Sequence, residues 1–362
     1  MSREIRPVIF VTVSMAGGGT ERVISILANK YCELGMSVTI LMIAGSQVAY
    51  ELDDRIQLIN VSGATGGSLI GRIKRVSKLR TIFRENKEAK IIAMGTVAAM
   101  FALLSKIGLR NKIVVSERND PNRLNHRPIR LPEKVLRNLL YRGATRLVLQ
   151  TEDVKSCFPQ SLIRKSIVIP NPISESLPET AVNDNREKTV ITAGRLTEQK
   201  NHKLLIDAFK DFENFHPGYC LRIFGEGELK EQLQDYIIHS GLQGKAYLEG
   251  FSKDLYGELQ RGGIYVSSSD WEGISNSLVE AMAMGIPTVA TDCPMGGSRM
   301  FIDSMKNGIL VPMKDREALV EAMSYVADHA DEVRGISQNA MEIREKLAAE
   351  KIAGQWLELF EE

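Results

Sequence analysis

Two carboxylates stand eight positions apart in this chain, where Glu272 and Glu280 flank a Gly-Ile-Ser-Asn turn. The apolar run Ile264–Ser267 precedes them, and Leu278–Met284 follows and ends at a glycine and a proline. This order predicts a buried strand, an acidic loop and then a short helix. The carboxylates therefore fall where a loop enters a helix, a position typical of ligand binding.

The start of that helix is suited to an anion. Ser275 or Asn276 is a natural N-cap, so backbone N–H groups and the positive end of the helix dipole face outward. We expect Gly273, Ile274, Ser275 and Asn276 to contact a ligand there. Carboxylates beside exposed amides suit a molecule with hydroxyls at one end and phosphates at the other, such as a nucleotide-sugar.

Two cations follow an earlier predicted strand, Thr189–Ala193. Arg195 and Lys200 lie in the loop that begins at Gly194 and leads into the next helix. Ligands of parallel α/β sheets bind beyond the carboxyl ends of the strands, where Arg can fork onto phosphate oxygens and Lys supplies a point charge. The alternative is a solvated loop with surface cations.

Glycine turns mark three other candidate contacts. Gly225 follows the strand that ends at Phe224, and Phe251 follows Gly250, so both turns could approach a base. In the first half, Gly18 and Gly19 open a long helix, where a backbone can approach phosphate closely. Each of these also has a plain interpretation as a tight turn. The first-half loop is no dinucleotide fingerprint, because its third glycine is replaced.

Other chemistries are disfavoured. The chain has no P-loop pattern, and the run around Ser275 fails the GxSxG elbow at its last position. No Asp-x-Asp pair is present to clamp a metal and a diphosphate, and the four cysteines and five histidines show no metal-binding spacing. We therefore expect no metal and no cofactor, and Arg195, Lys200 and backbone amides must neutralise any bound diphosphate.

Charge is distributed unevenly along the chain. Residues 1–170 hold 27 Lys and Arg against 13 Asp and Glu, whereas residues 171–362 hold 19 against 32. The segment 69–90 combines eight cations with an apolar helical stripe, and a second basic cluster spans 118–146. The segment 69–90 is either a surface helix packed on a sheet or an element that adheres to anionic lipid. Nucleic acid is disfavoured because no aromatic residues interleave with these cations.

Strand-like and helix-like segments alternate through the chain, which predicts two doubly wound α/β domains with parallel sheets. The Pro- and Asn-rich stretch 169–188 indicates a linker. We place an N-terminal Rossmann-like domain at residues 1–170 and a second domain at 171–349. The uncharged run 91–105 is 15 residues long, short of the about 20 that a membrane span needs. We interpret it as a strand and a helix.

Taken together, the ordered motifs resemble family 4 glycosyltransferases, which are retaining enzymes of the GT-B fold. The match extends over nearly the whole chain and rests on the Gly-Gly-x-Glu loop at 18–21, on Gly194–Lys200 and on the EX7E pair. The resemblance implies two Rossmann-like domains facing each other across a cleft, with the donor held mainly by the second. It also implies that a C-terminal helix, about 350–362, returns to the first domain.

The same resemblance implies roles for individual residues. Glu280 would hold the ribose hydroxyls, Glu272 the hydroxyls of the donor sugar, and Arg195 and Lys200 the diphosphate, assisted by amides near Ile274. Many relatives have a histidine in the first domain close to the transferred sugar. Arg118 stands at that position here, and we expect it to contact a sugar or phosphate.

The resulting hypothesis is a retaining glycosyltransferase. It would move a hexosyl or N-acetylhexosaminyl group from a UDP-sugar to a glycan or a polyprenyl-diphosphate-linked sugar. The basic first domain would bring it to the anionic inner face of the plasma membrane, as a cytoplasmic peripheral protein. The alternatives are a nucleotide-sugar epimerase of similar fold, a non-catalytic nucleotide-sugar-binding partner, and a soluble transferase acting on a small metabolite.

Overall fold

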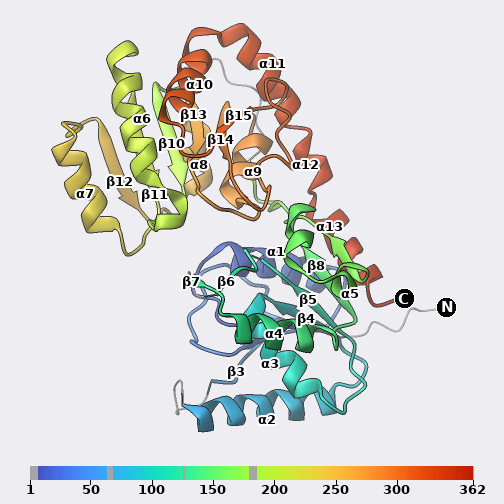
Figure 1. The fold of residues 1–362 in the computed structure, drawn as a ribbon. Coiled ribbons are helices and arrows are strands. Elements are labelled where there is room, and N and C mark those ends of the chain that lie inside the picture. Colours follow the sequence, from blue (N-terminus) through green and yellow to red (C-terminus); the bar gives the residue numbers. More distant parts are fainter. Residues whose placement is uncertain (1–6, 63–67, 119, 125–126, 179–185, 362) are drawn as a thin grey trace. The chain divides into compact units, whose positions relative to one another are not determined.

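The computed structural model describes residues 7–62, 68–118, 120–124, 127–178 and 186–361. The chain divides into two compact units, one formed by Met1–Ser174 with Leu347–Glu362 and the other by Glu175–Lys346. Each unit has its own parallel sheet, of seven and six strands respectively (Figure 1). The predicted fold class, two doubly wound α/β domains with parallel sheets, is confirmed.

The first sheet has the strand order β3-β2-β1-β4-β5-β8-β9. The chain leaves β1 in one direction and later returns to place β4 on the other side of it, so the strand order reverses between these two strands. The strands are β1 (Val8–Thr12), β2 (Val38–Met42), β3 (Gln57–Asn60), β4 (Lys90–Met94), β5 (Ile113–Ser116), β8 (Arg146–Leu149) and β9 (Ser166–Val168), with a short hairpin of β6 (Arg123–Leu124) and β7 (Arg127–Pro128).

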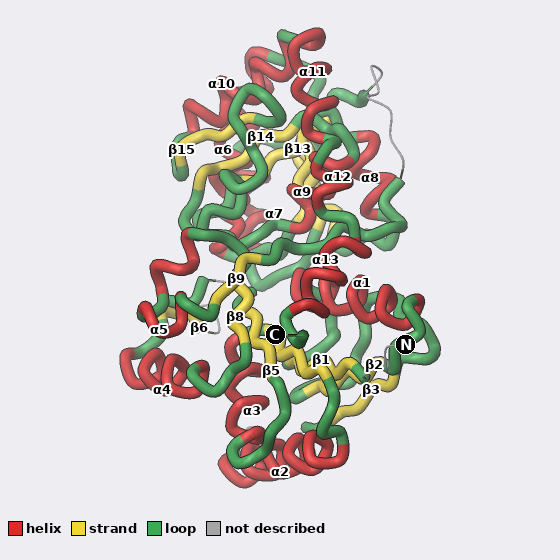
Figure 2. The backbone as a smooth tube through the Cα atoms, turned by 90° about the vertical axis from the view of Figure 1, so that its right-hand side faces the viewer, coloured by secondary structure: helices red, strands yellow, loops and turns green. Residues whose placement is uncertain are grey.

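Helices cover both faces of this sheet. One face carries α1 and α13, which contact each other, and the other carries α2, α3 and α4 in a row (Figure 2). Their bounds are α1 (Gly19–Glu33), α2 (Leu69–Glu85), α3 (Thr96–Lys106), α4 (Leu131–Tyr141), α5 (Gln160–Ile163) and α13 (Ala349–Glu358), with a 3₁₀ turn at Asp153–Cys157. The central strands β1, β4 and β5 are buried on both faces, as their continuous apolar runs predict.

The last helix belongs to the first unit although it is last in sequence. Trp356 of α13 is fully buried, and the Tyr31 hydroxyl of α1 donates to the carbonyl oxygen of Ala353 at 3.2 Å. A backbone bond from Ile173 to Leu347 lies where the chain passes between the units. The stretch 169–188 that we interpreted as a linker contains the division at Ser174, and its residues 179–185 lie outside the described part.

The second sheet has the order β12-β11-β10-β13-β14-β15, all parallel. Its strand order reverses between β10 and β13, which is where α/β sheets bind ligands. The strands are β10 (Thr189–Ala193), β11 (Cys220–Phe224), β12 (Ala246–Gly250), β13 (Ile264–Ser267), β14 (Thr288–Asp292) and β15 (Ile309–Pro312).

In the second unit, helix α6 packs against both α7 and α10. Helix α9 packs on strands β13 and β14, and helices α11 and α12 pack against α9. Their bounds are α6 (His202–Phe215), α7 (Lys230–His239), α8 (Leu255–Arg261), α9 (Asn276–Ala283), α10 (Arg316–Asp328), α11 (Ala330–Ala340) and α12 (Ile343–Lys346), with a 3₁₀ turn at Glu198–Lys200. A core of apolar side chains from β10, β11, β13, α6 and α10 holds this unit together.

The uncharged run 91–105 forms β4 and α3, as predicted. Among the helices of the described ranges, none combines the length and the apolar character that crossing a bilayer requires.

Packing of α13 yields a test of the first unit. Trp356→Ala removes a fully buried aromatic ring, a change that costs about 3–5 kcal/mol of unfolding free energy. Urea unfolding should show that loss, and amide hydrogen exchange should rise in α1 before it rises in β10. Phe215→Ala is the matched control, because Phe215 is 74% exposed, and it should leave both measurements unchanged. Equal urea midpoints for the two variants would contradict this assignment of α13.

Candidate active site

The loops after β10 and β13 are tied together at the point where the strand order reverses. The Asp270 amide donates to the Gln199 carbonyl at 2.9 Å, and the Gln199 side chain donates back to the Trp271 carbonyl at 3.0 Å. The Ser268 hydroxyl donates to the Lys200 carbonyl at 2.9 Å. One of these bonds joins backbone to backbone, and the other two join a side-chain donor to a backbone carbonyl, so the Gln199 and Ser268 side chains help to set the register between the two loops.

This register brings Lys200 and Glu272 into contact. The Lys200 Nζ lies 2.5 Å from Glu272 Oε2, and the two side chains are 14% and 13% exposed. The Ser269 hydroxyl donates to the same carboxylate oxygen at 3.1 Å. An ammonium carries three donors, so a lysine held by one carboxylate keeps capacity for phosphate oxygens. The structure thus joins two residues that the sequence placed 72 positions apart.

Arg195 lies in the same loop, with an exposed side chain. Its carbonyl oxygen is 3.2 Å from Nε2 of His202, the first residue of α6, so Nε2 carries the proton and donates. Burial, with the nearby Lys200 charge, lowers the pKa of His202 to about 4. His202 is therefore a neutral donor that fixes the backbone from which Arg195 projects. His202 was not predicted from sequence, because a single histidine at the start of a helix carries no spacing signal.

The first turn of α9 is anchored by hydroxyl groups. Tyr265 donates to the Ser277 oxygen at 2.8 Å, and Ser277 donates to the Ala193 carbonyl at 2.7 Å, which links the start of α9 to the end of β10. Ser275 occupies the N-cap position, but its side chain makes no capping bond; the expected side-chain cap is not formed, and Asn276 is the first helical residue. No acidic residue lies in this first turn, so the positive end of the helix is not neutralised there.

Glu280 projects from the second turn of α9 and is buried, with the Tyr256 hydroxyl 3.4 Å from its Oε1. The two glutamates thus have different supports. Glu272 is on the loop beside a cation, and Glu280 is on the helix near a phenol. Neither Tyr256 nor Ser269 was predicted, because a tyrosine in a neighbouring helix and a serine in a serine run are common in sequences of any function.

Close backbone approach explains the glycines around the site. Gly225 has φ +139°, and a β-carbon on it would lie 2.0 Å from the Gly194 carbonyl oxygen. A β-carbon on Gly297 would lie 1.4 Å from the Gly273 carbonyl oxygen. Only glycine permits these contacts. Phe251, beyond the end of β12, is 67% exposed, and its contact with a base stays a prediction.

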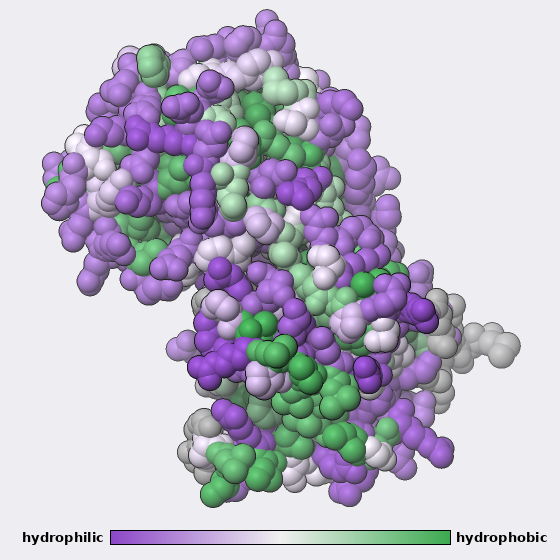
Figure 3. Space-filling model, in the orientation of Figure 1, coloured by the Kyte–Doolittle hydropathy of each residue, from purple (hydrophilic) through white to green (hydrophobic). Residues whose placement is uncertain are grey.

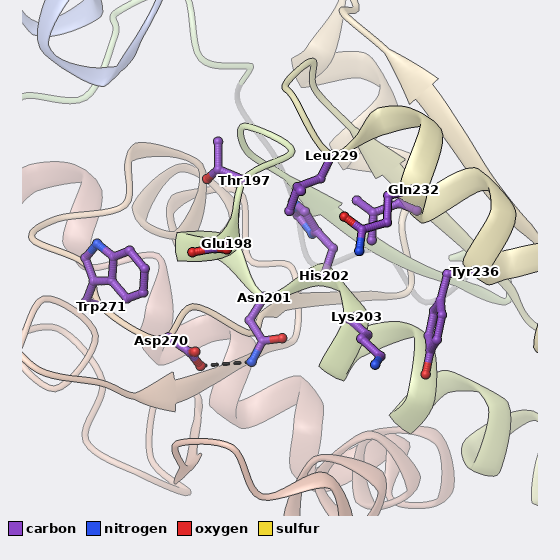
Figure 4. Close-up of a pocket in the computed structure, with 11 residues that line it drawn as sticks. Thr197, Glu198, Asn201, His202, Lys203, Leu229, Gln232, Tyr236, Asp270 and Trp271 are labelled. Atoms are coloured by element: carbon purple, nitrogen blue, oxygen red, sulfur yellow. Dashed lines mark hydrogen bonds between the residues drawn. The ribbon is translucent and has the colours of Figure 1, made fainter. Parts of the chain in front are cut away.

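A pocket of about 380 Å³ opens beside this pair of loops. Figure 4 shows Thr197 and Glu198 from the first loop, Asp270 and Trp271 from the second, and Tyr236 from α7 around it. The dashed line marks a hydrogen bond of 2.9 Å that the side-chain amide Nδ2 of Asn201 donates to Asp270 Oδ1, and this bond also joins the two loops. Asn201 also accepts from the Leu204 amide as the N-cap of α6, so one side chain holds both the helix start and the loop.

The predicted residues of the first unit have different surroundings. Gly18 is the N-cap of α1, which begins at Gly19, and Glu21 lies in the first turn of that helix. Arg118 is buried and donates to Asn171 Oδ1 and to Ser116 Oγ, and burial lowers its pKa to about 10. Its bonds are those of a side chain that ties β5 to residues near the unit boundary. Contact of Arg118 with a sugar or phosphate stays a prediction.

Within the described ranges, no group of three or more His, Cys, Asp or Glu side chains is placed to hold a metal ion.

Comparisons with known proteins agree with this geometry. Residues 174–343 match the family model of glycosyl transferases group 1. The chain is 26% identical over 353 residues to N-acetylgalactosamine-N,N'-diacetylbacillosaminyl-diphospho-undecaprenol 4-alpha-N-acetylgalactosaminyltransferase of Campylobacter jejuni, covering 92% of this chain and 93% of that protein. It is 24% identical over 355 residues to the amylovoran biosynthesis glycosyltransferase AmsD of Erwinia amylovora, covering 94% and 95%.

The fold has a counterpart in the crystal structure of Anabaena HepE in complex with UDP and glucose, with a TM-score of 0.81 at 19% identity over 98% of each chain. The two parallel-sheet units and these matches define a glycosyltransferase of the GT-B fold. Residues 174–343 belong to the group 1 glycosyltransferase family, and both named relatives are glycosyltransferases.

The buried His202 predicts an acid-dependent loss of stability. Its pKa falls from an ordinary value of 6.5 to about 4 on folding. The unfolded chain therefore binds the proton more tightly, and the stabilisation is complete above pH 6.5 and lost as pH falls toward 4. The loss amounts to about 3 kcal/mol.

Urea unfolding between pH 4 and pH 7 measures this loss. His202→Gln keeps a donor for the Arg195 carbonyl and does not titrate, so its stability should fall less steeply with acid than that of the wild type. The exposed His239 provides the control, and His239→Gln should keep the wild-type slope. Parallel curves for wild type and His202→Gln would show that this histidine is not held neutral.

Proposed function

We propose that this protein transfers a hexosyl or N-acetylhexosaminyl group, with retention, from a UDP-sugar to a glycan or a polyprenyl-diphosphate-linked sugar. The observation that carries the proposal is the Lys200–Glu272 pair, 2.5 Å apart where the strand order of the second sheet reverses, beside the N-terminus of α9. A cation, a carboxylate and helix amides in one place match the phosphates and hydroxyls of such a donor.

The donor would lie across the ends of β10, β11 and β13. Lys200, Arg195 and the amides from Gly273 to Asn276 would bind the diphosphate, and Glu272 would accept hydrogen bonds from sugar hydroxyls. Glu280 would bind the ribose hydroxyls. The backbone turns at Gly194 and Gly225 would contact the donor, with the exposed Phe251 available to cover the base. The HepE complex with UDP and glucose supports a uridine nucleotide as donor.

In the reaction, the bond from the anomeric carbon to the diphosphate oxygen breaks, and its electron pair leaves with UDP. The acceptor hydroxyl oxygen forms the new bond on the same face, and its proton passes to the leaving phosphate. Negative charge grows on the diphosphate in the transition state, so fixed cations and amides aimed at it accelerate the step. The alpha linkage in the name of the Campylobacter jejuni relative supports retention from an α-linked donor.

This assignment requires no divalent metal. Two side-chain cations and one helix end supply the countercharge that Mg²⁺ supplies elsewhere. The Lys200–Glu272 bond has a second consequence. When phosphate competes for the ammonium, Glu272 becomes available to the sugar, so donor binding would itself prepare the carboxylate.

The acceptor would be bound by the first unit, which carries the excess of positive charge. A polyprenyl-diphosphate-linked acceptor, like that named for the Campylobacter jejuni relative, places its sugar at a membrane surface. We therefore propose that the protein works as a peripheral protein on the cytoplasmic face of the plasma membrane.

Removal of either cation tests the catalytic assignment. Lys200→Ala or Arg195→Ala should lower kcat by about 10²–10³, the effect of losing one group that stabilises developing charge. Lys210→Ala is the control, because Lys210 is an exposed cation on α6, and its turnover should equal that of the wild type. The assay scores transfer from UDP-sugars to a lipid-linked acceptor, with and without EDTA.

Three outcomes would refute the proposal. Near-normal turnover in both alanine variants would remove the role of the cations, and loss of wild-type turnover in EDTA would remove the metal-free mechanism. Isomerisation of the donor sugar without any acceptor would identify an epimerase instead.

A further inference from the structure

Helix α4 buries polar side chains and exposes apolar ones, which is the reverse of an ordinary surface helix. Its Arg137 and Tyr141 are fully buried, whereas four aliphatic side chains point to solvent. The exposed fractions are 73% for Leu131, 58% for Val135, 45% for Leu136 and 58% for Leu139. Their spacing places them on one side of the helix. Apolar surface left in water is unfavourable, so this orientation must have a specific cause.

Contacts of the buried residues supply that cause. The Arg137 guanidinium donates to the Pro121 carbonyl and to Asn138 Oδ1, and it lies 4.7 Å from the centre of the Phe158 ring. The Tyr141 hydroxyl donates to the buried carboxylate of Glu117, whose pKa burial raises. Turning the leucines inward would break these bonds and expose both partners. The rotation of α4 about its axis is therefore fixed with its aliphatic side outward.

The apolar surface continues onto the neighbouring helix. α3 packs against α4, and beyond its C-terminal end Ile107 is 63% exposed. In Figure 3 this surface is the green area over α3 and α4 of the first unit. We call it the α3–α4 face, comprising Ile107, Leu131, Val135, Leu136 and Leu139. Exposed apolar surface of this continuity marks an interaction site.

Cations border the α3–α4 face. Arg127, Arg130, Lys134 and Arg142 lie on or next to α4, and the sequence of α4 holds a single acidic residue, Glu133. Glu133 is paired with Arg127 at 2.6 Å and accepts from the Arg130 amide at 3.0 Å, so its charge is compensated locally. An occupant of this face therefore meets apolar side chains surrounded by positive charge.

Helix α2, for which the sequence left lipid adhesion as one of two alternatives, is only partly arranged to bind lipid. α2 packs on its unit through Leu79 and Phe83, which supports the interpretation as a surface helix. Its first turns leave Leu69, Ile70 and Ile73 exposed, near the cations Arg72 and Lys74. In Figure 3 a separate green area lies at the lower end of the first unit, where Figure 1 places α2.

We propose that the α3–α4 face docks on an anionic lipid bilayer. Aliphatic side chains would enter the boundary between headgroups and acyl chains, and the bordering cations would bind headgroup phosphates. The charge of the border favours a bilayer over a second copy of the chain, since two such faces would bring like charges together. The inference deepens the proposed lipid-linked acceptor by naming the surface that meets the membrane, yet membrane binding can be measured without any substrate.

The test is co-sedimentation of the full-length protein with vesicles, in the absence of donor and acceptor. The variant Leu131→Ser, Val135→Ser, Leu139→Ser removes apolar groups that are already in water, so its unfolding midpoint should stay at or above that of the wild type. On vesicles of phosphatidylcholine with phosphatidylglycerol we expect the variant to bind at least about tenfold more weakly than the wild type. Phe215→Ser with Ile238→Ser is the matched control, since both residues are exposed in the second unit, and its binding should be unchanged.

Charge provides an independent arm. Arg130→Glu with Lys134→Glu should weaken binding to anionic vesicles, and salt should weaken binding of the wild type. Wild-type affinity of both α4 variants would overturn the proposal. Concentration-dependent dimerisation that the serine variant abolishes, with no vesicle binding by the wild type, would also overturn it and assign the face to a second copy.

Turnover on a short water-soluble acceptor should stay within about twofold of the wild type in all α4 variants, because the bilayer is absent there. If transfer fails while vesicle binding holds, the proposed function is wrong and the docking surface stands.

Discussion

The contact between Lys200 and Glu272 is the constraint on which the rest of the site depends. A cation and a carboxylate 2.5 Å apart, both mostly removed from water, must be held by their surroundings, because desolvation of each charge opposes the pair. The surroundings are hydrogen bonds between the 199–201 and 268–271 segments, donated by the Asp270 amide and by the Gln199 and Ser268 side chains to backbone carbonyls. The strand order of the second sheet creates this arrangement, since the reversal between β10 and β13 places the two loops next to each other.

Neutral groups complete the site around that charged pair. His202 fixes the Arg195 backbone without adding charge, and Ser277 joins the start of α9 to the end of β10. The glycines at 225 and 297 let main chains approach to distances that a β-carbon would forbid. The second unit thus presents fixed donors and cations at one sheet edge. Such preorganisation is what stabilises charge developing on a leaving diphosphate.

Much of this could be predicted from sequence, for identifiable reasons. Buried strands such as β5 and β13 appear as short continuous apolar runs, and the EX7E spacing placed one glutamate on the loop and the other on α9. The strands β3, β12 and β15 were not predicted. For β3 and β12 the reason is that each is an edge strand with exposed residues and a polar member, which gives no continuous apolar run. The roles of His202 and Ser277 depend on contacts between distant segments, which no local pattern reports. The orientation of α4 was missed because a buried arginine runs against the usual preference.

The most direct measurement of the central claim is calorimetric binding of UDP and of uridine in EDTA, to wild type and to Lys200→Met. The account predicts that wild type binds UDP at least about tenfold more tightly than uridine, a difference near 1.4 kcal/mol, and that the variant loses most of this preference. A preference for UDP that requires divalent metal, or that persists unchanged in Lys200→Met, would contradict it.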